Sequence, residues 1–346
     1  MISLSVDEVS GFVKERYKIT ALEIVPLLGG WLNEKWCIAT PTGEYVFKTL
    51  NPDKYKRLCQ DTTGQSYIDN SILATLELQN DLNQRGILCP KTYSTEGGLL
   101  TTYQDGTSCV LMDYLRGEIK TSETISLEEM YSLGEATSKM LSEMEAYSGK
   151  TPQSSLLELR TLLELENYHR EKKSKIERKT NPRYVKNVML QESILADLAK
   201  SGLLTQVKKG LIHGDYANDN ILFSENKFAG IIDFELVRKN ALLQDIGRAI
   251  MSFAYHNNSL RRDYVNSFID GYNQNPNNPL GQISGQDVVA GIKMVWCNEA
   301  HLWIKESYYN KPVGEKVTRF MNELEWIEES WFNLDAIAGT KLKAKK

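Results

Sequence analysis

The chain has 346 residues, a length typical of two domains or lobes with a cleft between them. Its 41% hydrophobic and 25% charged residues are ordinary for a soluble globular protein, and a formal net charge of −4 argues against nucleic acid as its main partner. No apolar run reaches membrane-spanning length, the N-terminus lacks the features of a signal peptide, and the five cysteines are scattered, so we expect a cytoplasmic protein that does not bind membranes.

The first part of the chain has the pattern of a helix followed by three antiparallel strands. Apolar residues recur at helical spacing in residues 6–17. Turn-forming residues, among them Gly29, Gly30 and Gly43, then separate β-prone segments at residues 22–28, 32–39 and 44–50. Backbone near glycine can approach a phosphate closely, and a lysine on a strand, here Lys48, can neutralise one. Taken alone, these residues are equally well explained as a hairpin turn and a surface lysine.

A second helix and a hairpin complete this part. Residues 67–85 have a mostly helical spacing of apolar residues, and Glu77 is the only glutamate among them. Residues 99–103 and 108–112 are predicted to form two strands joined around Asp105-Gly106. Up to about residue 115 the predicted order is therefore a helix, three strands, a second helix and a hairpin.

The chain then becomes mainly helical. Ser126 together with Glu129 has the signature of a capping box, and an apolar stripe continues from there to Met144. Residues 155–205 predict two or three further helices, with a charged run at residues 166–179. That run indicates either a solvated helix face or a surface that contacts a polar substrate.

The most informative stretch is residues 211–235. Two apolar, β-prone runs are separated by four turn-type residues, which predicts a hairpin. A polar loop with Asp215 and Asn220 precedes its first strand, and Asp233 ends its second. Three oxygen-bearing side chains would therefore converge on one small volume. The alternative is a plain hairpin with polar ends.

Helical spacing returns at residues 242–253, where Asp245 suits the positive end of the helix dipole. Two long helices are predicted towards the C-terminus, and they contain the tryptophans Trp296, Trp303, Trp326 and Trp331. An aromatic wall of this kind could bind a quaternary ammonium group or a sugar face. Aromatic residues at helical spacing more often belong to the core.

An Asp followed five residues later by an Asn, and then by a hairpin that ends in Asp-Phe, is the arrangement of a kinase catalytic loop and its metal-binding Asp. Here the loop begins His213-Gly214-Asp215, and the hairpin ends in Ile-Ile-Asp-Phe-Glu at residues 231–235. In this form the motifs resemble those of the aminoglycoside phosphotransferase and choline kinase family of small-molecule kinases. The glycine in His-Gly-Asp and the lack of a downstream Ala-Pro-Glu segment argue against a protein kinase.

The resemblance implies ATP and Mg²⁺ as cofactors. Asp215 would accept the proton of the acceptor hydroxyl, and Asn220 and Asp233 would hold Mg²⁺. We expect His213 to order the loop rather than to react, and Asp245 to support the loop from behind. The residues expected to bind the nucleotide are Lys48, Gly29, Gly30, Glu77 and, at the hinge that meets the adenine, Met112 and Tyr114.

Glu77 is expected to hold Lys48 in place, because a kinase N-lobe needs an acid on this helix. Counting back from the Gly-Ile-x-x-Pro turn at residues 86–90, however, puts Thr75 at the family's position. A solvated helix face is the alternative for Glu77.

The implied fold is α+β with two lobes, as in protein kinases. Residues 1–115 would form the N-terminal nucleotide-binding lobe, an antiparallel sheet with a helix. Residues 116–346 would form the larger, mainly helical lobe that binds the acceptor, with a helical insert at about 150–205.

The expected activity is ATP-dependent phosphorylation of a hydroxyl on a small polar molecule. An amine-bearing acceptor, such as an amino sugar, aminoglycoside or amino alcohol, is favoured because carboxylates in the site, Glu235 included, would repel an anion. Later glutamates could attract the amine or be surface charges: Glu299, Glu306 and Glu323. The alternative function is a non-catalytic binding or structural role, as in kinase-like spore-coat proteins. The pattern does not indicate an oligomeric state.

Overall fold

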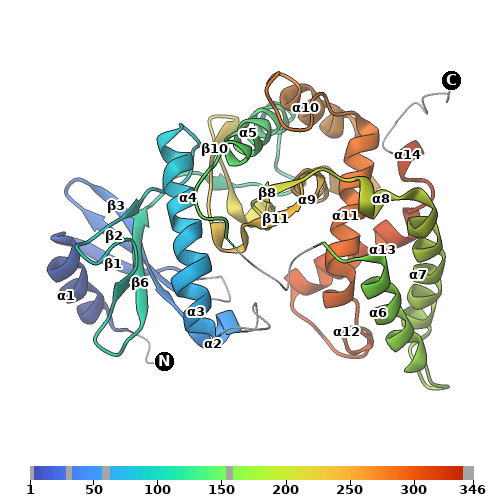
Figure 1. The fold of residues 1–346 in the computed structure, drawn as a ribbon, viewed down its shortest axis with the longest axis horizontal. Coiled ribbons are helices and arrows are strands. Elements are labelled where there is room, and N and C mark those ends of the chain that lie inside the picture. Colours follow the sequence, from blue (N-terminus) through green and yellow to red (C-terminus); the bar gives the residue numbers. More distant parts are fainter. Residues whose placement is uncertain (1–3, 29–32, 57–62, 153–158, 338–346) are drawn as a thin grey trace.

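The computed structural model describes residues 4–28, 33–56, 63–152 and 159–337, with the side chains of residues 300–303 excepted. Two lobes lie side by side (Figure 1), one built on an antiparallel sheet and the other mainly helical. The α+β, two-lobed fold predicted from the sequence is confirmed. The expected glycine turn, Gly29-Gly30, lies outside the described residues.

The sheet of the N-terminal lobe has the order β1-β2-β3-β6-β4, and β5 also pairs with β6. Its strands are β1 (Glu23–Pro26), β2 (Glu34–Thr40), β3 (Gly43–Leu50), β4 (Thr92–Tyr93), β5 (Thr101–Thr102) and β6 (Ser108–Asp113). All neighbouring strands are antiparallel, and Lys35 on β2 lies directly opposite Lys48 on β3. The predicted three-strand meander is therefore confirmed.

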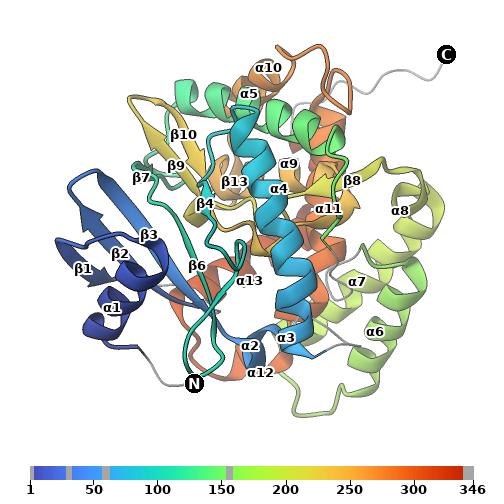
Figure 2. The ribbon, with the colours of Figure 1, turned by 60° about the vertical axis from the view of Figure 1, so that its left-hand side comes forward.

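Successive side chains of each strand point to opposite faces of the sheet, and both faces are apolar. Helix α1 (Val6–Tyr17) packs on one face, where Trp36, Ile38 and Phe47 are buried. The other face is covered by a helical segment made of α3 (Gly64–Tyr67), a π-helical turn (Ile68–Ile72) and α4 (Leu73–Gln84), after the short helix α2 (Pro52–Tyr55). The sheet is thus enclosed between α1 and α4 (Figure 2).

The C-terminal lobe is a helical assembly around one large apolar core. Its helices are α5 (Leu127–Glu145), α6 (Leu162–Ser174), α7 (Pro182–Ser201), α8 (Leu203–Gln206), α9 (Leu243–Phe253), α10 (Arg262–Tyr272), α11 (Gly285–Trp303), α12 (Glu306–Asn310), α13 (Glu315–Ser330) and α14 (Leu334–Ile337). The predicted capping box at the start of α5 is present, with Ser126 and Glu129 bonded reciprocally. Trp296, Trp326 and Trp331 are buried, which confirms that these residues belong to the core.

The predicted hairpin lies where the two lobes meet. Strand β9 (Ile221–Ser224) pairs with β10 (Lys227–Ile231) on one side and with β7 (Glu118–Ile119) on the other, while β8 (Lys209–Ile212) pairs with β11 (Arg238–Ala241). A small second hairpin follows α9, with β12 (Tyr255–His256) and β13 (Ser259–Leu260). The N–H of Ile231 donates to the carbonyl of Leu88 in the N-terminal lobe, 2.9 Å away.

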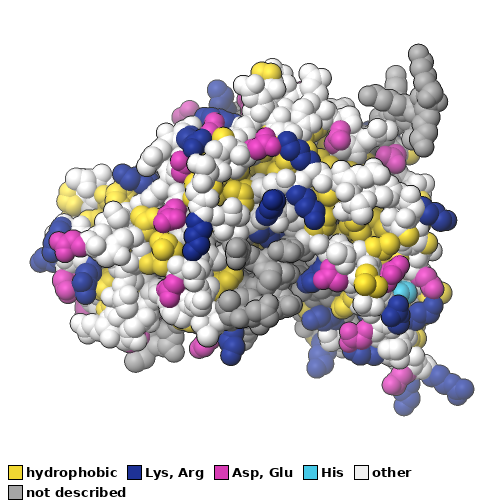
Figure 3. All heavy atoms as spheres, viewed as in Figure 1, with side chains coloured by type: hydrophobic (Ala, Val, Ile, Leu, Met, Phe, Trp, Pro, Cys, Tyr) yellow, Lys and Arg dark blue, Asp and Glu magenta, His cyan; other side chains and the backbone are white. Residues whose placement is uncertain are grey.

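Charged side chains of both signs are interspersed over the face shown in Figure 3. The charged run at residues 166–179 is mostly exposed, as expected of a solvated helix face. His169 and Lys172 are the buried exceptions, and Lys172 lies over the ring of Tyr168 and donates to Gln191 at 3.3 Å. In the described part of the chain, no helix combines the length and apolarity needed to cross a membrane.

Candidate active site

The loop that carries Asp215 is held from behind by a buried carboxylate. Both oxygens of Asp245 accept backbone N–H groups, from His213 at 2.7 Å and from Gly214 at 3.0 Å. Asp245 is in the first turn of α9, so the position of that helix determines the position of the loop. The prediction that Asp245 supports the catalytic loop is confirmed.

Gly214 is required by the geometry of this loop. Its φ is +81°, and a Cβ at this position would lie 2.1 Å from Arg238 Nη1 and 2.3 Å from the Leu236 carbonyl oxygen. The Arg238 guanidinium fills that space and donates to the carbonyls of Gly214 and Leu236, at 3.2 and 2.8 Å. Only glycine, which has no Cβ, allows the His-Gly-Asp loop to pack this closely against Arg238.

His213 orders the loop, as expected. It is fully buried, and its Nδ1 accepts the N–H of Asp215 at 3.3 Å. Nε2 is therefore protonated and donates to the carbonyl of Ile232, 3.1 Å away. Burial also lowers the pKa of His213, despite the opposing charges of Asp245 and Asp233. A neutral imidazole thus connects the start of the loop to the end of β10.

Asp215 and Asn220 face one another across this loop. The Nδ2 of Asn220 lies 2.9 Å from both the carboxylate Oδ2 and the carbonyl oxygen of Asp215. Burial raises the pKa of Asp215, and the charges of Asp219 and Asp233 raise it further. A partly buried carboxylate with a raised pKa is the kind of group that can accept a proton near neutral pH.

Asp233 lies two residues beyond the end of β10 in a left-handed conformation, with φ of 67°. Its carboxylate lies 3.3 Å from Lys48 Nζ and 3.6 Å from Lys35 Nζ. Although burial opposes ionisation, the two lysines hold the pKa of Asp233 below its usual range. The N–H of Ile232 also donates to the carbonyl of Asn220 at 2.9 Å, so Asp233 and Asn220 are held in neighbouring segments.

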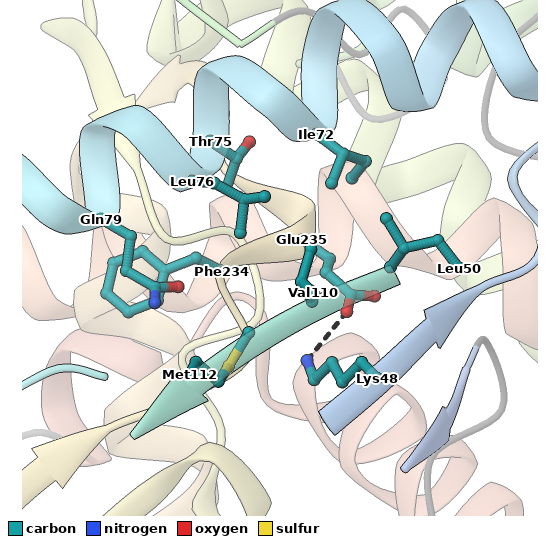
Figure 4. Close-up of a pocket in the computed structure, with 10 residues that line it drawn as sticks. All are labelled: Lys48, Leu50, Ile72, Thr75, Leu76, Gln79, Val110, Met112, Phe234 and Glu235. Atoms are coloured by element: carbon teal, nitrogen blue, oxygen red, sulfur yellow. Dashed lines mark hydrogen bonds and ion pairs between the residues drawn. The ribbon is translucent and has the colours of Figure 1, made fainter. Parts of the chain in front are cut away.

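The expected pairing of Glu77 with Lys48 is wrong. Glu77 is exposed on the outer face of α4, and the residues of α4 that line the same pocket as Lys48 are Thr75, Leu76 and Gln79 (Figure 4). In the described structure Lys48 pairs instead with Asp233 and with Glu235, the latter at 2.9 Å. Burial alone would lower the pKa of Lys48, but these two carboxylates raise it above its usual range.

The hinge residues lie at the end of β6. Met112 is buried in the pocket of Figure 4, beside Val110 and Gln79. Tyr114 is more exposed, and its N–H donates to the carbonyl of Glu44 at 3.1 Å. Their contact with adenine stays a prediction.

The sequence reasoning missed Lys35 and Arg248. The signal for Lys35 was its place opposite Lys48 on the neighbouring strand, which puts both side chains on the same face of the sheet. Arg248 on α9 lies 3.6 Å from Glu299 and 3.3 Å from Glu323, two of the late glutamates named as candidates for the acceptor pocket. The charge of Asp215 acts on Arg248 and on Glu299, so this cluster is near the catalytic loop.

A two-lobed α+β fold with such a loop between the lobes defines a class of kinase-like, small-molecule phosphotransferases. A family model for the phosphotransferase enzyme family matches residues 23–281 of this chain. The chain belongs to this family and is a small-molecule kinase that phosphorylates a hydroxyl group.

Two homoserine kinases match this chain at low sequence identity. The homoserine kinase of Methylobacillus glycogenes is 22% identical over 252 residues, which are 72% of this chain and 70% of that protein. The homoserine kinase of Methylobacillus flagellatus is 22% identical over 307 residues, 85% of this chain and 82% of that protein.

Solved structures agree in fold at still lower identity. An amicoumacin kinase in complex with AMP-PNP, Ca²⁺ and Ami has a TM-score of 0.65 and 14% identity, over 96% of this chain and 95% of that one. A spectinomycin phosphotransferase in complex with ADP and spectinomycin has a TM-score of 0.58 and 10% identity, over 98% of each chain.

Proposed function

We propose that this protein transfers the γ-phosphoryl group of ATP to a hydroxyl group of a small, amine-bearing molecule. The observation that carries the proposal is the convergence of Lys48 and Asp233 from the two lobes, beside the Asp215–Asn220 pair of the catalytic loop. The homoserine kinases and the nucleotide-bound neighbours support it.

In this proposal Asp215 orients the acceptor hydroxyl and takes its proton. The hydroxyl oxygen forms the new bond to the γ-phosphorus, the bond from that phosphorus to the β–γ bridging oxygen breaks, and ADP leaves. Lys48 neutralises phosphate charge, and Lys35, on the same face of the sheet, adds a second cation. Met112 and Tyr114 belong to the segment proposed to meet the adenine.

The residues present fit a magnesium site. A carboxylate and an amide oxygen are hard ligands of the kind that Mg²⁺ prefers, and Asp233 and Asn220 supply them. Because Nδ2 of Asn220 donates to Asp215, Oδ1 is the amide atom available to a cation. When bound, Mg²⁺ would offset the negative charge of the phosphates.

The carboxylates around Asp215 favour a neutral or cationic acceptor. Asp219, Glu299 and Glu323 all lie near the catalytic loop, where Arg248 offsets part of the charge of the two glutamates and Lys316 pairs with Asp219. An anion would meet these carboxylates in a partly dry cleft. The names of the relatives agree with an amine-bearing acceptor, because homoserine carries an ammonium group, which its carboxylate balances to no net charge. Amino alcohols, amino sugars and aminocyclitols are therefore the substrate classes to test first.

An ATP-consumption screen over hydroxylated amines (homoserine among them), neutral sugars and hydroxy acids tests the function. We expect turnover with at least one amine, and the Asp215→Ala variant should lose roughly 10²–10⁴-fold of that rate while it keeps its fold and nucleotide binding. Turnover confined to hydroxy acids would contradict the acceptor class. Near-normal turnover by Asp215→Ala would remove Asp215 from the mechanism. Nucleotide binding without turnover of any acceptor would favour the non-catalytic alternative.

A further inference from the structure

Lys48 has two carboxylate partners, and they differ in what else they do. Asp233 is the proposed metal ligand, so its oxygens are needed by the nucleotide complex. Glu235, two residues later, has no such task. Its Oε1 lies 2.9 Å from Lys48 Nζ, and its buried side chain lies between the strands and the helical segment with Ile72 and Thr75 (Figure 4).

The Glu235 carboxylate is held by two further residues of the N-terminal lobe. Nδ2 of Asn33 lies 2.8 Å from each of its oxygens, and the hydroxyl of Tyr55 donates to Oε2 at 2.8 Å. Tyr55 is fully buried, and Oδ1 of Asn33 accepts the N–H of Asn51 at 3.3 Å, which fixes the orientation of the amide. A buried carboxylate with several donors is held in one position.

Helix α4 offers no competing acid. Thr75 and Gln79 occupy its pocket-facing positions, and Thr75 Oγ1 already donates to the carbonyl of Ser71 at 2.9 Å. Of the two acids on this helix, Glu77 is exposed and Asp81 pairs with Arg85 at 2.7 Å. The buried partner of Lys48 therefore comes from the short helical turn Phe234–Leu236 that follows β10, 187 residues away along the chain.

We propose that Glu235 is the positioning residue that holds Lys48 ready for the nucleotide phosphates, in place of an acid on α4, and that Asn33 and Tyr55 hold Glu235. The proposal rests on the proposed nucleotide-dependent function. It means that the phosphate-binding lysine and the candidate metal acid are fixed by a single short segment, Asp233–Glu235, rather than by the placement of α4.

The test is a double-mutant cycle on nucleotide affinity, measured by calorimetry with AMP-PNP and Mg²⁺, which needs no acceptor. Glu235→Gln should weaken binding roughly 10- to 100-fold, the loss expected for a hydrogen bond to a charged group. In a Lys48→Ala background the same change should have little further effect, because the interaction is already absent. Glu77→Gln is the matched control and should bind as the wild type does.

A rescue variant separates positioning from a merely structural role. Glu235→Gln combined with Thr75→Glu returns a carboxylate to the pocket from the α4 side, and should recover part of the lost affinity. Equal affinity of Glu235→Gln and wild type, or additive losses in the Lys48→Ala background, would overturn the proposal. Weaker binding by Glu77→Gln would overturn it too. Failure of the wild type to bind AMP-PNP would instead count against the proposed function itself.

Discussion

At the scale of single residues, Asp233 combines two lysine partners with a left-handed backbone conformation. Two lysines from adjacent strands reach its carboxylate, and its left-handed backbone conformation is one that Asp tolerates better than most residues. The lysines keep the carboxylate ionised. A permanently charged carboxylate can exchange its lysine partners for a divalent cation that arrives with the nucleotide.

We therefore expect nucleotide binding to require a divalent metal and to depend on Asp233 more than on Asn220, because a carboxylate offsets the metal charge and an amide does not. Titration of AMP-PNP with and without Mg²⁺ measures this dependence. Asp233→Asn should lose most of it, and Asn220→Ala should lose less. Equal metal dependence in the wild type and Asp233→Asn would refute the assignment.

Glu299 is a second residue whose surroundings set its charge. Burial raises its pKa to about 7, and the charges of Asp215 and Glu323 act in the same direction. Arg248, 3.6 Å away on α9, and Arg238 act in the opposite direction. Above about pH 7 the side chain is an anion, and below it the side chain is neutral.

The raised pKa of Glu299 predicts that acceptor binding depends on pH. If Glu299 attracts the acceptor amine, which stays protonated at these pH values, the Kd of the acceptor should rise as pH falls below about 7, by at most about tenfold per pH unit. Calorimetry between about pH 5.5 and 8, the range in which the carboxyl group would titrate, measures it. Glu299→Gln should bind more weakly at high pH and should lose this dependence. An unchanged profile in that variant would show that Glu299 does not contact the amine.

At the scale of elements, the crossing of α9 and α11 positions the site. A Cβ on Gly247 would lie 2.2 Å from the backbone of Gly291, and a Cβ on Gly291 would lie 2.4 Å from the carbonyl oxygen of Leu243. The two helices therefore touch backbone to backbone. This contact fixes the position of α9, which carries Asp245, relative to α11, which carries Glu299.

Gly247→Ala should force these helices apart and lower the free energy of unfolding by about 1–3 kcal/mol, the usual cost of overpacking. Catalysis should fall with it, because Asp245 moves. Gly11→Ala is the control, since Gly11 is an exposed residue of α1 with open space around it, and there alanine should stabilise by about 0.5–1 kcal/mol. Urea unfolding of both variants and the wild type measures these changes in the free energy of unfolding. An unchanged midpoint for Gly247→Ala would mean that the crossing is not tight.

At the scale of the whole molecule, the two lobes share apolar core and polar contacts. Leu78, Leu82 and Ile87, from α4 and the turn after it, belong to the same buried cluster as the helices of the C-terminal lobe. The ion pair between Lys48 and Glu235 joins the lobes at the site. The proposed boundary near residue 115 therefore separates two lobes that complete each other's core.

We expect the protein to unfold in one cooperative transition, because neither lobe can bury these residues alone. Differential scanning calorimetry should give equal calorimetric and van't Hoff enthalpies. AMP-PNP with Mg²⁺ at 100 times its Kd should stabilise the folded protein by about 2.7 kcal/mol. Two resolved transitions would show that the lobes fold independently.

The sequence by itself determined the local features of this protein. The spacing of Asp215 and Asn220 within one loop, the turn between β9 and β10 and the capping box at Ser126 all depend on residues that are near neighbours along the chain. Alternation along the strands likewise predicted the meander that carries Lys48. Such patterns can be recognised in a sequence because side-chain directions repeat every two residues in a strand and every three to four residues in a helix.

Only the tertiary structure decided which distant residues meet. Glu77 and Glu235 were both acids near a kinase motif, and local periodicity could not say which one would reach Lys48. The packing of α4 turned Glu77 to solvent, while Asn33 and Tyr55 provided donors for Glu235. The same holds for Arg248 with Glu299 and Glu323. A buried charge is stable only where its partners converge on it, and that convergence is a property of the packed chain.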